Sequence, residues 1–187
     1  MACIREIGVF AVAGLLTGAL LSGPPAVSAQ TPERSVQPDR EDAEKLYRKA
    51  RSVEATDERS MQLTAAWLYR ESARFWPKGH EKRYRSLWRA AHLYLHQGRA
   101  THAAALLTAA GRQARRNDRP ERAATCYLRV ARLAAERGDE ARARRALHEV
   151  RPLLGRDRLD REERRQLMAM EANVRAMITE LAESSSR

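Results

Sequence analysis

A pattern that recurs after forty residues constrains the fold of this chain more than any other feature. In the first copy, apolar residues with helical spacing lie on both sides of Gly98. Because glycine has no Cβ, Gly98 allows the backbone angles of a tight turn. The pattern therefore predicts two helices folded back on each other, the first with Leu87, Ala90, Ala91 and Tyr94 and the second with Ala103, Leu107 and Ala110.

The second copy of the pattern keeps the same order around a turn at Gly138. Its first helix would carry Tyr127, Val130, Ala131 and Ala134, and its second helix Ala143, Leu147 and Val150. Small residues on the second helices would let neighbouring helix backbones approach closely. A hairpin of this kind cannot bury its apolar side alone, so we expect the copies to pack on each other.

The two copies resemble the tetratricopeptide repeat family, whose units are helix–turn–helix pairs of about 34 residues. The resemblance lies in the large–small–small–aromatic order of the first helix, the turn glycine and the Ala–Leu–Ala of the second. It covers roughly residues 41 to 154, with an earlier half-match at Ala65, Tyr69 and Pro77. The resemblance implies a right-handed stack of about three hairpins. The longer spacing predicts an extra loop near Arg115–Glu121, and the first unit lacks a turn glycine.

Apolar periodicity and helix-breaking residues predict seven helices and an all-α fold. We expect the first two helices near 41–54 and 58–75 and the sixth over 140–154. The fifth helix should start after Asp118 as N-cap, with Pro120 in its first turn. The seventh, from about residue 160, should cap the stack with Leu167, Met170, Val174, Met177, Ile178 and Leu181. The repeat domain would span 41–183, followed by a frayed tail at 184–187.

The amino-terminal residues 1–29 have the pattern of a secretory signal peptide. A basic residue, Arg5, precedes an apolar run from 8 to 21, and Val27-Ser28-Ala29 fits the small-residue cleavage rule. We therefore expect cleavage after Ala29 and export to a bacterial periplasm or cell envelope. An uncleaved membrane anchor is the alternative, because Glu6 offsets Arg5. Polar residues 30–40 would form a disordered lead-in.

The formal net charge is +11, and only four of the 35 basic side chains are lysine. One interpretation is compositional, with arginine–glutamate pairs on solvated helix faces. The other is a basic surface for an anionic partner. Export would make an acidic protein, an anionic lipid or a cell-wall polymer more plausible than nucleic acid. The candidate basic patch consists of Arg112, Arg115, Arg116, Arg119, Arg122, Arg142, Arg144 and Arg145.

The family resemblance also implies a binding groove, because the first helices of successive tetratricopeptide units line a concave surface. By matching position, this groove would contain Arg85, Trp88, His92, His96, Leu128, Arg132 and Glu136. Tryptophan and arginine commonly anchor protein interfaces, so we expect a protein or peptide partner. The alternative is that Trp88 packs against a neighbouring helix and the histidines are solvated.

Other candidate sites are less informative. His92 and His96 share a helix face near His102, but no Cys, Asp or Glu completes a zinc site nearby, so we expect neither metal nor cofactor. Cys126, the one cysteine after residue 29, should be buried, with an intermolecular disulfide as the alternative. The aromatic cluster of Trp67, Phe75 and Trp76 should pack between the first two units rather than form a binding patch.

The sequence contains no pattern of an enzyme active site. A glycine-rich phosphate loop, a His-Glu-x-x-His zinc motif and a Gly-x-Ser-x-Gly nucleophile turn are all missing from the sequence. We therefore expect an adaptor or assembly factor that binds a partner and catalyses no reaction.

Overall fold

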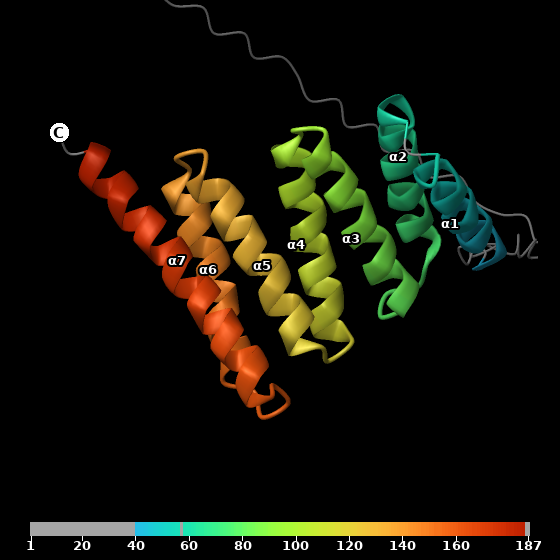
Figure 1. Ribbon diagram of the computed structural model, residues 1–187. Coiled ribbons are helices and arrows are strands. Elements are labelled where there is room, and N and C mark those ends of the chain that lie inside the picture. The colour runs from blue at the N-terminus through green and yellow to red at the C-terminus, as the bar shows by residue number, and fades with distance from the viewer. Residues whose placement is uncertain (1–39, 57, 186–187) are drawn as a thin grey trace, which may run out of the picture. The chain divides into compact units, whose positions relative to one another are not determined.

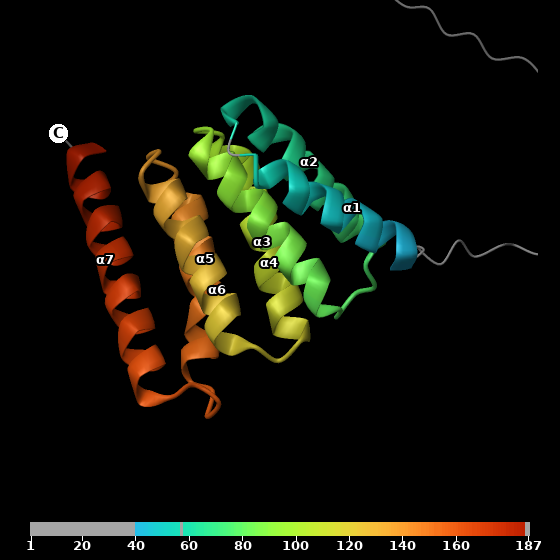
Figure 2. The ribbon, with the colours of Figure 1, turned by 45° about the vertical axis from the view of Figure 1, so that its right-hand side comes forward.

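The computed structural model describes residues 40–56 and 58–185. Within these ranges the chain forms seven helices and no strands, which confirms the all-α fold (Figure 1). Each helix packs on the next one, and α7 packs on both α5 and α6 (Figure 2). The helices are α1 (Arg40–Glu54), α2 (Arg59–Phe75), α3 (Glu81–His96), α4 (Ala100–Arg116), α5 (Pro120–Ala135), α6 (Glu140–Leu154) and α7 (Arg161–Ser185).

The predicted turns are confirmed at both glycines. Gly98 has φ 69° between α3 and α4, and Gly138 has φ 74° between α5 and α6, values that L-residues rarely adopt. Each turn closes with a backbone hydrogen bond, from Arg99 to the carbonyl of Tyr94 at 2.8 Å and from Asp139 to that of Ala134 at 2.9 Å. The first helix of each hairpin therefore reverses into the second within a few residues.

The expected extra loop near residues 115–121 is wrong, because the additional residues lengthen the helices. α4 is 17 residues long, and only Asn117, Asp118 and Arg119 connect it to α5. Buried Gln113 and Ala114 keep the last turn of α4 helical. Pro120 starts α5 as expected, but Arg119 occupies the N-cap position, and Asp118 adopts φ 53° in the turn. Long helices thus account for the forty-residue period.

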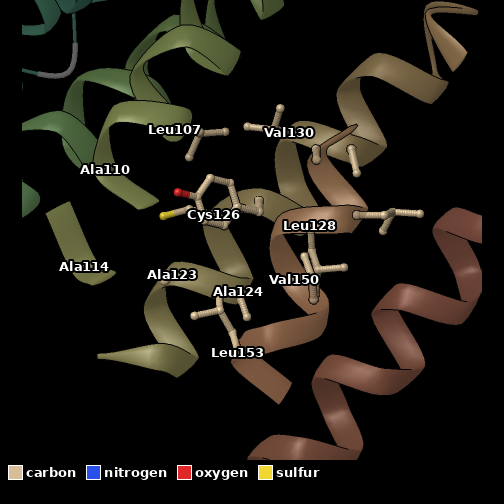
Figure 3. Packing of buried hydrophobic residues seen from close by; sticks show 14 of the residues in the cluster. Leu107, Ala110, Ala114, Ala123, Ala124, Cys126, Leu128, Val130, Val150 and Leu153 are labelled. Carbon is tan, nitrogen blue, oxygen red and sulfur yellow. The ribbon is translucent and has the colours of Figure 1, made fainter. Parts of the chain in front are cut away.

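The core is built largely from small side chains, which bring neighbouring helices close together. One buried cluster joins α1 to α4, and a larger one extends from α2 to α7 (Figure 3). At the contact between α4 and α5, a Cβ on Gly111 would lie 3.0 Å from Tyr127 Cζ and 3.2 Å from Cys126 Cβ. The absence of a side chain at Gly111 therefore sets how closely these two hairpins pack.

The seventh helix covers the end of the stack with a slightly different set of residues from the one expected. Leu167, Val174 and Ile178 are buried, whereas Met170 is 37% exposed. Glu171, rather than Met170, lies on the buried side of α7, because residues 167, 171, 174 and 178 share one side of a helix. Arg175 donates to the Glu171 carboxylate at 2.6 Å and so compensates its charge.

The amino-terminal predictions fall on residues that lie outside the described part of the chain. These are the signal peptide at 1–29 and all of the lead-in except Arg40, which belongs to α1. At the other end, α7 continues to Ser185, so half of the expected frayed tail is helical. No helix in the described ranges combines the length and the apolar character needed to cross a membrane.

Candidate binding groove

A hollow of about 730 Å³ opens between α1 and α3, and one residue of α2 borders it. We call it the α1–α3 groove. Four of the predicted groove residues, Arg85, Trp88, His92 and His96, follow one another along the α3 side. The complete lining is Tyr47, Glu54, Gln62, Tyr84, Arg85, Trp88, Arg89, His92, Leu93 and His96.

Trp88 is one of these lining residues and is half-buried. Its ring centroid is 6.1 Å from that of Tyr84 and 4.7 Å from that of His92. The guanidinium of Arg129, from α5, stacks over the indole with its Cζ 4.7 Å from the ring centroid. Trp88 also packs against the larger core cluster. The indole therefore both packs against a neighbouring helix and lines the groove, which combines the two interpretations of the sequence.

Burial and the neighbouring Arg129 both affect the protonation of His92. The Nη1 of Arg129 lies 2.7 Å from His92 Nε2, and a guanidinium can only donate, so Nε2 must accept. Burial lowers the pKa of His92, and the positive charge of Arg129 lowers it further. The ring is therefore neutral at physiological pH, with its proton on Nδ1.

Two repeated contacts join the first helices of successive hairpins. On α1, Glu44 and Tyr47 both contact Lys82 of α3. The Nζ of Lys82 lies 2.5 Å from the Glu44 carboxylate and 5.9 Å from the centroid of the Tyr47 ring. On α3, Glu81 and Tyr84 both contact Arg122 of α5. The Nη1 of Arg122 lies 2.5 Å from the Glu81 carboxylate, and its Cζ lies 5.3 Å from the centroid of the Tyr84 ring. The same Glu-x-x-Tyr pair thus binds a cation from the next hairpin in both places.

A second pair of cations follows the same forty-residue relation. Arg89 of α3 binds Glu54 of α1 at 3.1 Å, and Arg129 of α5 binds His92 of α3. Glu54 also accepts a hydrogen bond of 2.7 Å from the hydroxyl of Tyr69. The charges around the α1–α3 groove are therefore largely paired with one another.

Sequence reasoning missed these contacts, although the sequence contains a signal for them. A Glu-x-x-Tyr pair in each of two helices is followed 38 or 41 residues later by a cation. The lining residues Tyr47 and Glu54 were missed because the first unit matches the repeat pattern poorly.

Three of the predicted groove residues lie elsewhere. Leu128 is fully buried in the core cluster that also contains Val150 and Leu153 of α6, so its assignment to the groove is wrong (Figure 3). Arg132 and Glu136 are exposed and pair with each other at 2.7 Å, and neither lines the α1–α3 groove. Matching positions by forty residues did not identify Arg122 and Arg129, the residues of α5 that contact α3.

The predicted basic patch does not form one continuous surface. Arg122 binds Glu81 on α3, Arg115 binds Glu149 on α6 at 2.6 Å, and Arg144 binds Glu140 at 2.6 Å. A separate hollow of about 470 Å³ is bordered by Arg112, Arg142 and Arg145 but also by Asp139 and Glu149. Arg116 is exposed at the end of α4 and Arg119 is exposed in the turn that follows. Acidic neighbours therefore interrupt the arginine clusters.

Cys126 is buried, as expected. Burial raises the pKa of its thiol to about 12, so the nucleophilic thiolate is scarcely populated. In the described part of the chain, no three His, Cys, Asp or Glu residues come together as a metal site.

The aromatic cluster at the end of α2 separates into different environments. Trp76 is buried, and its Nε1 donates to Ser72 Oγ at 3.0 Å. Phe75 is partly buried. Trp67 is 48% exposed, so its expected place in the core is wrong.

No family model matches this chain, and no curated protein or solved structure matches it either.

Proposed function

We propose that this protein is a tetratricopeptide-like binding module that holds a segment of a partner protein in the α1–α3 groove. The observation that supports the proposal most directly is that Trp88 is half-buried and lines a hollow of about 730 Å³. A partly exposed tryptophan offers a large apolar surface at a small cost in side-chain entropy, which is why it anchors many interfaces.

We infer that the contacts around Trp88 preorganise the groove for a partner. Arg129 holds one side of the indole, and the ion pairs from Lys82 and Arg122 connect α1, α3 and α5. A preformed site loses less conformational entropy when it binds. Exposed Arg85 and His96 border the groove and can donate hydrogen bonds to the carbonyl groups of an extended segment.

The proposal places this binding module in the periplasm or cell envelope as an adaptor or assembly factor. That location rests on the sequence pattern of residues 1–29 alone.

The proposal can be tested with two Trp→Ala substitutions, one inside the groove and one outside it. Peptides selected from a display library on the purified chain should bind the Trp88→Ala variant about thirtyfold more weakly, a loss of about 2 kcal/mol. Trp67→Ala, which removes an exposed tryptophan from α2, should leave their Kd unchanged. Circular dichroism should show intact helices in both variants. Equal affinities for the two variants would contradict the groove as the binding site.

A further inference from the structure

A second hollow, of about 480 Å³, lies between α6 and α7 at the end of the stack, and we call it the α6–α7 slot. It is lined by Arg144, Leu147, His148, Arg151, Arg175, Ile178 and Thr179. The slot thus combines three arginines and a histidine with two apolar side chains, Leu147 and Ile178, which are almost entirely buried.

The forty-residue register identifies what this position would contain if the stack continued. In the preceding hairpin, α6 packs on α5 and is tied to α4 by the Arg115–Glu149 pair. By the same relation, the second helix of a further hairpin would pack on α7 and border α6. The α6–α7 slot is therefore the position that a further second helix would border.

One side of α7 supports this assignment. Leu128 on α5 is fully buried in the core cluster that includes residues of α6. Forty residues later, Met168 on α7 is 55% exposed. Met168 lies on the same side of α7 as Arg175 and Thr179, which line the α6–α7 slot. The helix surface that receives a neighbour in α5 is thus uncovered in α7.

The sequence of α6 changes at positions that face the following helices. Arg144 and His148 stand where α4 has Ala104 and Thr108, which line hollows that α4 shares with α5 and α6. Arg151 stands where α4 has Gly111, which faces α5. The end of a repeat stack must be polar to be soluble, but it need not carry charge of one sign. The replacement of small residues by basic ones alone indicates more than a solvated end.

The charge of the α6–α7 slot is not neutralised within it. No acidic residue lines it, and Arg151 and His148 have neither a hydrogen bond nor an ion pair within the described ranges. Arg144 and Arg175 bind Glu140 and Glu171 on their own helices, each at 2.6 Å, and keep further N–H groups for other acceptors. Converging cations beside a low-dielectric wall give a positive potential that attracts acidic groups.

We propose that the α6–α7 slot binds an acidic amphipathic helix of a partner protein, which extends the stack. The apolar side of that helix would cover Leu147 and Ile178, and its carboxylates would pair with Arg144, Arg151 and Arg175. This surface is separate from the α1–α3 groove, so the two proposals stand or fall independently.

A peptide derived from α6 provides a probe of known shape, because α6 already packs on a first helix in this way. The probe is the 15-residue α6 sequence with every arginine replaced by glutamate and an outward-facing staple to hold it helical. The stapled peptide with the natural α6 sequence is its basic control. Fluorescence anisotropy with the purified full chain should show binding of the acidic peptide and at least about tenfold weaker binding of the control.

Charge reversal on the protein tests the location of this binding. The double variant Arg144→Glu/Arg151→Glu should lose at least about tenfold in affinity for the acidic peptide and gain affinity for the basic one. The double variant Arg112→Glu/Arg145→Glu, with the same change in net charge, should bind as the natural chain does. The proposal is wrong if both double variants behave alike or if the acidic peptide does not bind.

Vesicles that contain phosphatidylglycerol distinguish a lipid surface from a helix. We expect the full chain to bind the acidic peptide equally well whether or not such vesicles are present. Displacement of the peptide by the vesicles, together with loss of vesicle binding in Arg144→Glu/Arg151→Glu, would overturn the proposal in favour of a lipid site.

Discussion

The α1–α3 groove and the α6–α7 slot both adjoin the first helix of a hairpin, but their charges are arranged in opposite ways. In the α1–α3 groove, Arg89 binds Glu54 of the neighbouring helix and Arg129 covers Trp88. In the α6–α7 slot, Arg151 and His148 have no such partners within the described ranges. His148 and Arg151 belong to α6, a second helix, whereas Arg89 and Arg129 belong to first helices that contact the preceding first helix.

This comparison suggests that the repeat uses similar residues for two purposes. Inside the stack, cations such as Lys82 and Arg122 connect one hairpin to the next. Along the α6–α7 slot, the side chains of His148 and Arg151 have no hydrogen bond or ion pair in the described ranges, so we expect them to be available to a partner. We therefore expect the α1–α3 groove to recognise its partner by aromatic packing and the α6–α7 slot to recognise its partner by charge.

The largest expected effect tests whether the end of the stack is open. Leu128→Ala should lower the free energy of unfolding by about 3 kcal/mol, because it leaves a cavity in the core. Met168→Ala, at the equivalent position on α7, should change it by less than about 0.5 kcal/mol. Urea denaturation followed by circular dichroism measures both. A large loss in Met168→Ala would mean that the side of α7 next to the α6–α7 slot is covered.

The next effect sharpens the difference in charge between the two surfaces. Binding of the acidic helical peptide to the α6–α7 slot should weaken by about tenfold or more between about 0.05 M and about 0.5 M salt. Peptides bound in the α1–α3 groove should lose less than about threefold, since the charges there are already paired. Titrations over a series of salt concentrations measure both slopes. Equal slopes would remove the distinction between the two surfaces.

The smallest effect concerns the neutral histidine of the α1–α3 groove. The pKa of His92 is lowered in the folded protein, so the unfolded chain takes up its proton first as the pH falls through about 6.5. The free energy of unfolding should therefore fall as the pH decreases from about 7 to about 5. In His92→Gln, which does not titrate and can still accept from Arg129, this decrease should be smaller.

His80 provides a related variant for the pH measurement. Burial and the nearby charges of Arg40 and Lys82 lower the pKa of His80. The double variant His80→Gln/His92→Gln should therefore show a weaker pH dependence than either single variant. If the free energy of unfolding of His92→Gln depended on pH in the same way as that of the natural chain, a neutral His92 would be contradicted.

The sequence by itself determined the helices and the turns between them. Apolar spacing predicted the helices, and Gly98, Gly138 and Pro120 marked where helices turn or begin. These features depend on residues close together in the chain, whose backbone preferences hold in any surroundings. The error at residues 115–121 arose from assuming a family-typical helix length, which buried Gln113 and Ala114 exceed.

Only the tertiary structure decided which side of each helix is buried and which charges meet. Trp88, Leu128 and Met168 follow one another at intervals of forty residues, yet their environments differ. Trp88 lines a groove, Leu128 is buried in the core and Met168 is exposed to solvent. The neighbours that each helix happens to have produce this difference. Helical periodicity fixes which residues share a side, but burial and ion pairing depend on helices that arrive from elsewhere in the chain.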